Sequence, residues 1–495
     1  MVRVLDKRGR MDMNKRRSST NYIYNLMFQI INLLLPIITT PYISRILQAD
    51  NIGIYSYTYS VVTTFVLFGS LGTATYGQKE IAAAGDDKKL VSKTFLEINT
   101  VKLIAMGLAL IVYMCMSLLS TTNRIYYLVQ IPYLISAALD ISWFYQGIED
   151  FKYVSIRSSA IKIISTVFIF LLVRNHDDLI LYLLIMCLSQ LVGNIPMWTR
   201  LSHEVICVKI KISDLKRHLR PTLVYFVPSI ATQVYAVLDK VMLGMIVASN
   251  AENGYYEQAH KIINMTMTIV TSYTVVMRSR MSYLFVQNKI DEIKSKLIES
   301  LHFVCFLIFP MGFGMGGIAE NFVPWFFGEG FTKVTVIIYA FCPLYFFLGI
   351  CTCIGTHILT PGGWQSKSNI GQVLGAIANL ILNAILIPKF LSVGAAIAST
   401  STELLIMIVY LYYSKEFIRW RDICRISMKY FIASIVMFIP LFIISRKLPS
   451  SIINTMILVG IGAAIYIVML FVIRASITDN IKVVIRSKLE RSLQE

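Results

Sequence analysis

Charged residues are scarce in this chain of 495 residues, and acidic residues are the scarcest. Asp, Glu, Lys and Arg together make up 15% of the chain, whereas 56% of the residues are hydrophobic. The mean hydropathy is +0.65. Soluble globular proteins carry a larger share of charge, so this composition excludes that class. It favours a polytopic membrane protein.

Several motifs of enzymes and metal proteins are also absent from the sequence. It contains no phosphate-binding loop of the Gly-x4-Gly-Lys-Ser/Thr type, so we expect no ATP hydrolysis by this chain itself. The eight cysteines are scattered and share no metal-ligand spacing with histidine. No connection carries a Ser/His/Asp, Cys/His or paired-carboxylate constellation. We therefore expect no catalytic residues, no cofactor, no metal site and no enzymatic activity.

Long apolar runs are what the sequence does contain. Runs of about 17 to 25 residues, long enough to cross a bilayer core of about 30 Å, recur fourteen times. They cover residues 22–44, 52–77, 98–119, 125–148, 153–173, 179–199, 222–247, 255–277, 301–318, 334–356, 368–388, 391–413, 428–445 and 452–473. The first run is too long for the core of a signal peptide, so we expect this helix to stay in the protein.

The basic residues collect on one side when the connections alternate across the membrane. Of the 46 Lys and Arg residues, 35 fall in the N-terminus, the C-terminus and every second connection, and seven fall in the others. The remaining four lie inside helices and are Lys102, Lys162, Lys240 and Lys261. By the positive-inside rule, both termini are expected in the cytoplasm. The net charge of +18 is explained by this distribution of basic residues across the membrane, so we expect no nucleic-acid partner.

Two local patterns recur after six helices. Leu35-Pro36-Ile37 in the first run resembles Val227-Pro228-Ser229 in the seventh. Gly53-Ile54-Tyr55 opens the second run and Gly254-Tyr255-Tyr256 opens the eighth. Because six is an even number, both halves enter the membrane from the same side, which predicts a parallel repeat with a cavity between two lobes. The expected division is a basic N-terminus (1–19), a six-helix lobe (20–200), a basic linker (201–220), a second six-helix lobe (221–413), two additional helices (414–474) and a tail (475–495).

One string connects two apolar runs and carries several interface signals. In Asp140–Phe151, Trp143 and Tyr145 lie where a helix would leave the bilayer, Gly147 can end it, and Glu149 and Asp150 can meet water. This string resembles the one that closes the fourth membrane helix in bacterial polysaccharide repeat-unit flippases. These are the Wzx-type branch of the superfamily that also holds MATE exporters and the lipid II flippase. Leu35–Ile46, Gly53–Tyr57, Gly69–Tyr76 and Gly254–Ile262 match the same pattern.

The resemblance implies a fold, a location and a substrate. The fold would be an all-α, MATE-like bundle of about fourteen membrane helices in the bacterial cell membrane. The substrate would be an oligosaccharide repeat unit on undecaprenyl diphosphate, flipped to the outer leaflet for capsular, exopolysaccharide or O-antigen synthesis. Polysaccharide polymerase and chain-length machinery would be further partners.

Ionisable residues inside membrane helices are functional candidates, because each costs at least about 2.5 to 3.5 kcal/mol to insert. The candidates for the anionic diphosphate are Lys240, Lys261, Lys162, Arg45 and Arg280. The candidates for a coupling cation are Asp239, Asp140 and Glu403. Each has a structural alternative. The lysines can pair with Asp239 or reach the interface, the arginines can anchor helix ends, and the acids can cap helices or bond between them.

We therefore expect a flippase that works by alternating access through a cationic cavity. Two other functions stay open. One is a cation-coupled, MATE-like exporter of small molecules, against which the excess of buried lysines argues. The other is a membrane glycan polymerase or ligase, for which a larger outward loop would be expected. Asn379 and Asn383, one helical turn apart and followed by the small residues of 394–400, are interpreted as helix-packing residues.

Overall fold

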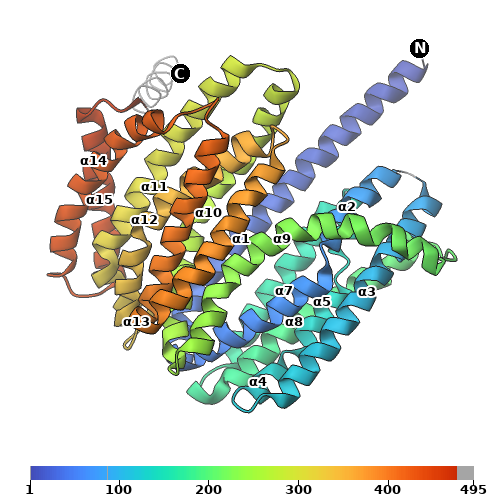
Figure 1. The fold of residues 1–495 in the computed structure, drawn as a ribbon, viewed down its shortest axis with the longest axis horizontal. Coiled ribbons are helices and arrows are strands. Elements are labelled where there is room, and N and C mark those ends of the chain that lie inside the picture. The colour runs from blue at the N-terminus through green and yellow to red at the C-terminus, as the bar shows by residue number, and fades with distance from the viewer. Residues whose placement is uncertain (1, 86, 477–495) are drawn as a thin grey trace, which may run out of the picture. The chain divides into compact units, whose positions relative to one another are not determined.

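The computed structural model describes the backbone of residues 2–85 and 87–476, and their side chains except at 2–23, 25–26, 227–229 and 231–236. Within these residues every regular element is a helix, as Figure 1 shows. The α-helices are α1 (Val2–Ser70), α2 (Thr73–Ala84), α3 (Lys88–Leu119), α4 (Arg124–Val129), α5 (Ile131–Leu139), α6 (Ser142–Gly147), α7 (Phe151–Leu172), α8 (Leu179–Glu204), α9 (Ile212–Ile246), α10 (Asn250–Val286), α11 (Ile290–Phe327), α12 (Thr332–Ile354), α13 (Gln365–Tyr413), α14 (Trp420–Ser445) and α15 (Ile452–Val472). A 3₁₀ turn, η1 (His176–Asp178), and a π turn, η2 (Gly355–Leu359), complete the set.

Ten helical segments of the described chain are long and apolar enough to cross a membrane. Two of the longest helices contain a sharp kink, because Gln48 in α1 and Leu391 in α13 adopt φ angles of 57° and 56°. Each kink separates two runs that the sequence predicts as different spans. The predicted spans 222–247 and 255–277 lie in α9 and α10, which are not among the ten segments. The all-α membrane fold is therefore confirmed, and the count of fourteen stays a prediction.

The chain divides into two compact units, Met1–Val237 and Leu238–Glu495. In the first unit, α1 packs against α3 and α7, and α5 packs against α8. In the second unit, α11 packs against α12 and α14, while α15 packs on α14 and α11 (Figure 1). The last two helices thus belong to the packed core of the second unit. The expected lobe and linker boundaries remain predictions.

The aromatic string of the first unit faces the interior of that unit. The predicted helix 125–148 is broken into α4, α5 and α6, and Trp143, Phe144 and Tyr145 on α6 are at most 2% exposed. Trp143 stacks on Phe95 of α3, with ring centroids 5.5 Å apart. The break at Asp140 turns this short helix toward α2 and α3. Hydropathy reports how apolar a segment is and not the direction of its side chains.

Two glycines allow α2 and α6 to approach each other. A Cβ atom on Gly77 would lie 2.5 Å from the ring of Trp143. One on Gly147 would lie 2.7 Å from the side chain of Ile81. Such distances are far below van der Waals contact, so these two positions require glycine for packing rather than for backbone freedom.

A buried carboxylate joins the start of α9 to the first unit. Glu97 of α3 is fully buried, and its Oε2 accepts a short hydrogen bond from Arg217 and lies 2.8 Å from Nε2 of His218. The other ring nitrogen of His218 is 2.8 Å from the hydroxyl of Tyr76 on α2. Two basic residues of the predicted linker are therefore part of the packed first unit.

Candidate functional site

The second unit contains a buried carboxylate, that of Asp239. It lies near the end of α9 and is 4% exposed. Its Oδ1 accepts hydrogen bonds from the amide groups of Asn379 and Asn383 on α13, at 3.0 and 2.6 Å. Its Oδ2 accepts short hydrogen bonds from the hydroxyls of Tyr256 and Ser399. The two asparagines, interpreted from sequence as packing residues, thus hold a carboxylate. We call these five side chains the Asp239 cluster.

The Asp239 cluster contains a carboxylate without a basic partner. Within the described residues, no Lys, Arg or His side chain forms an ion pair with it. The side-chain oxygen of Asn383 is buried and has no hydrogen-bond partner there. Four donated hydrogen bonds thus stabilise this buried carboxylate in place of an ion pair. No group of three His, Cys, Asp or Glu residues that could hold a metal occurs in the described part of the chain.

Two lysines of the same unit share one carboxylate. Nζ of Lys240 lies 2.6 Å from Oε2 of Glu257, and Nζ of Lys261 lies 4.0 Å from its Oε1. The side chains are 17%, 29% and 13% exposed for Lys240, Lys261 and Glu257. The backbone oxygen of Lys240 accepts a hydrogen bond from Asn253 at 2.7 Å. Two positive charges thus face one negative charge, and we call these three residues the lysine cluster.

Pairing with Asp239 was the structural alternative to substrate binding for these lysines, and the structure places Glu257 beside them instead. Asp239 and Lys240 are neighbours on α9, so their side chains leave the helix in different directions. Glu257 was not among the sequence candidates. Its spacing of four residues from Lys261, which places both on one face of α10, was the signal that could have identified it.

Asp140 lies beside a polar cavity of about 260 Å³ within the first unit. The lining includes three tyrosines, Asp140, and the polar side chains of Arg157, Gln190 and Asn194. The Asp140 carboxylate caps the backbone N–H of Ser142 at 2.8 Å, and its backbone oxygen accepts a hydrogen bond from Lys102. Arg157 donates a hydrogen bond to the side-chain oxygen of Asn194. The Asp140 carboxylate therefore caps a helix and also lines the cavity.

The other candidates belong to neither cluster. In the first unit, Lys162 donates a short hydrogen bond to Asn32 and lies 5.4 Å from the ring centroid of Phe28. Arg45 is exposed on α1. In the second unit, Arg280 is exposed and lies over the ring of Tyr283. Glu403 is 5% exposed within α13. The structure therefore brings together Lys240 and Lys261, and it places Asp239 in a separate cluster on the same helix as Lys240.

Sequence comparison identifies the family. The profile of the polysaccharide biosynthesis protein family matches residues 18–283, more than half of the chain, and the chain belongs to this family. It is 24% identical over 405 residues to the "Putative O-antigen transporter" of Escherichia coli strain K12, covering 80% of this chain and 96% of that protein. It is also 24% identical over 194 residues to the "Probable low-salt glycan biosynthesis flippase Agl15" of Haloferax volcanii, covering 39% of this chain and 40% of that one.

Solved structures confirm the transporter fold. The lipid II flippase MurJ, in an inward closed conformation, aligns with a TM-score of 0.75 at 15% identity and covers 92% of this chain and 99% of that one. An inward-facing MATE family multidrug transporter aligns with a TM-score of 0.58 at 10% identity, covering 81% and 96%. The protein is thus a multi-pass membrane protein with a MurJ- and MATE-like fold.

Proposed function

We propose that this protein is a flippase that moves undecaprenyl-diphosphate-linked oligosaccharide repeat units from the cytoplasmic to the outer leaflet. Such a lipid has a large, polar, anionic head. The observation that carries the proposal is the lysine cluster, which presents two ammonium groups to one carboxylate on two helices that the sequence predicts to span the membrane. An excess of positive charge at a poorly hydrated site would offset the charge of a diphosphate.

Movement without bond-making is the second part of the proposal. The function needs a path for the head group and a change of accessibility, and it needs no catalytic residue. The lipid-linked glycan would pass on to a polymerase and its chain-length partners. Alternating access, both termini in the cytoplasm, and the assignments of Lys162, Arg45 and Arg280 to the substrate belong to this proposal.

The Asp239 cluster would couple transport to an ion gradient. It offers a carboxylate, two hydroxyl oxygens and two amide groups, and amide oxygen and nitrogen exchange places by a simple flip. With both amides flipped, the oxygens around Asp239 would suit a monovalent cation, whereas a proton on the carboxylate would require one of the two hydroxyls to turn and accept a hydrogen bond from it. Asp140 and Glu403 are the weaker candidates for this role.

The substrate class is tested by deleting the gene in its own host. We expect lipid-linked repeat units to accumulate on the cytoplasmic leaflet while their synthesis continues. A probe that labels glycans only at the outer surface separates the alternatives. If repeat units reach the outer leaflet and fail to be joined, the protein is a polymerase or ligase. If glycan export is normal and sensitivity to cationic drugs rises, it is a small-molecule exporter.

A further inference from the structure

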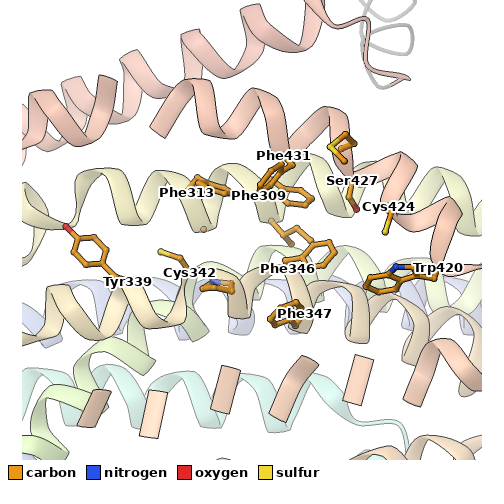
Figure 2. A pocket seen from close by; sticks show the side chains of 14 residues that line it. Phe309, Phe313, Tyr339, Cys342, Phe346, Phe347, Trp420, Cys424, Ser427 and Phe431 are labelled. Atoms are coloured by element: carbon orange, nitrogen blue, oxygen red, sulfur yellow. The ribbon is translucent and has the colours of Figure 1, made fainter. Parts of the chain in front are cut away.

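The second unit contains an apolar pocket of about 440 Å³ that belongs to neither polar cluster. Its volume falls within the range of about 300 to 1,000 Å³ that is usual for ligand sites. Figure 2 shows Tyr339 and Trp420 toward opposite ends, with Phe309, Phe346 and Phe431 between them. The pocket is lined by α11, α12 and α14. Its lining is almost entirely hydrophobic, which indicates an apolar ligand.

The pocket follows one face of α14. Trp420, Cys424, Ser427, Met428 and Phe431 line it, at the spacing of one helical face. From Trp420 to Phe431 the helix rises roughly 16 Å. This is about half of a bilayer core of about 30 Å, so the α14 wall of the pocket has the length of one leaflet. Met428 and Phe431 are 53% and 39% exposed, so the pocket opens at the surface of the unit.

Positive charge lies at the Trp420 end. Arg421 and Arg425 are exposed and one turn apart, and they lie on the face of α14 next to the one that lines the pocket, from which their long side chains can reach toward its end. Neither has an ion-pair or hydrogen-bond partner among the residues that the structure describes. The acid between them, Asp422, is paired with Arg419 at 3.3 Å. Asp422 also attracts Arg421 electrostatically, so an anion at the end of the pocket would compete with Asp422 for that arginine and would find Arg425 without an ion-pair partner among the described residues.

We propose that this pocket binds an anionic phospholipid, with one acyl chain along α14 and the phosphate at Arg421 and Arg425. Guanidinium groups bind phosphate oxygens in pairs, and tryptophan favours the level of the head groups. In the predicted topology the start of α14 faces the cytoplasm, where anionic lipids attract basic residues. The one-leaflet length fits an acyl chain better than an undecaprenyl chain, which is several times longer. Bulk phospholipid also exceeds any biosynthetic intermediate in amount, so mass action favours it.

The test measures lipid retention by the full-length protein. Purified protein would be stripped of lipid and supplied with phosphatidylglycerol or with phosphatidylcholine that has the same acyl chains. Native mass spectrometry would then measure how many lipid molecules stay bound. We expect one tightly held phosphatidylglycerol and weak retention of phosphatidylcholine. The double variant Arg421→Gln with Arg425→Gln should weaken the binding of phosphatidylglycerol roughly 30-fold, because each basic group near a charged head group contributes to the binding free energy. Cys424→Phe should reduce retention by filling the pocket.

Two controls separate this site from general effects. Lys209→Gln with Lys211→Gln removes the same charge from exposed positions before α9 and should leave lipid retention unchanged. Because Arg421 and Arg425 are exposed, their double variant should fold normally, which its elution as a single species would verify. Equal retention by the arginine variant, or unchanged retention by Cys424→Phe, would overturn the proposal. Retention of undecaprenyl phosphate in preference to phosphatidylglycerol would overturn it too and would assign the pocket to the transported lipid.

Discussion

The ammonium group of Lys240 lies 2.6 Å from the carboxylate of Glu257, one helical turn before Lys261 on α10. This contact changes what a substitution of either lysine should do. Glu257 keeps a partner when one lysine is removed, and both lysines lose theirs when Glu257 is removed. The lysine cluster therefore allows a role in binding to be separated from a role in stability.

Lys261→Ala should reduce flipping strongly at normal protein abundance, because Lys240 still neutralises Glu257 while one of two positive charges is lost. Lys261→Arg should keep part of the activity, since the charge survives while its geometry changes. The measurement is the ratio of lipid-linked repeat units at the two leaflets, with protein abundance measured in the same membranes. If Lys261→Ala instead lowers abundance, and Glu257→Gln restores both abundance and flipping in the double variant, Lys261 has no direct role in binding.

Asp239→Asn should preserve the fold and abolish ion coupling. The retained side-chain oxygen can accept hydrogen bonds from Asn379 and Asn383. The new amide can donate hydrogen bonds to the hydroxyls of Tyr256 and Ser399, because these hydroxyls can rotate to accept them. Asp239→Leu should strand these donors and destabilise the protein by about 1 to 3 kcal/mol per group. Unfolding midpoints in detergent, and flipping in vesicles with imposed sodium or proton gradients, distinguish the two effects. Gradient-dependent flipping by Asp239→Asn would remove Asp239 from the coupling mechanism.

Gly147→Ala and Gly77→Ala should each destabilise the first unit by about 1 to 3 kcal/mol, because the new methyl group overlaps Ile81 or Trp143. Gly107→Ala is the matched control, since nothing lies within 4 Å of a Cβ atom there. This change on α3 should be neutral or slightly stabilising, because alanine favours helix over glycine. Thermal unfolding of the purified proteins gives the comparison. An equal midpoint for all three variants would contradict the packing of α2 against α6.

The predicted topology places Asn250 outside the cytoplasm and Lys209 inside it. A reporter that is active only outside the cytoplasm should be active when fused after Asn250 and inactive after Lys209. The basis is the division of basic residues, 35 on one side and seven on the other. The reverse pattern would contradict both the orientation and the count of fourteen spans.

The sequence by itself determined the membrane class and the helical runs. These follow from local composition, because a run of apolar residues must form a helix in lipid wherever it lies in the fold. The resemblance of Asp140–Phe151 also led to the correct family. The kinks at Gln48 and Leu391 fall between runs that the sequence separates, so even these breaks had a local signal.

The tertiary structure decided which groups meet. Asp239 is held by Asn379 and Asn383, which follow it by 140 and 144 residues. No local pattern relates such distant positions, because their contact depends on how α9, α10 and α13 pack. The same holds for Trp143, whose direction follows from the break at Asp140 and the approach of α2. Composition determines which segments leave water, whereas the three-dimensional packing of helices determines which polar groups satisfy one another there.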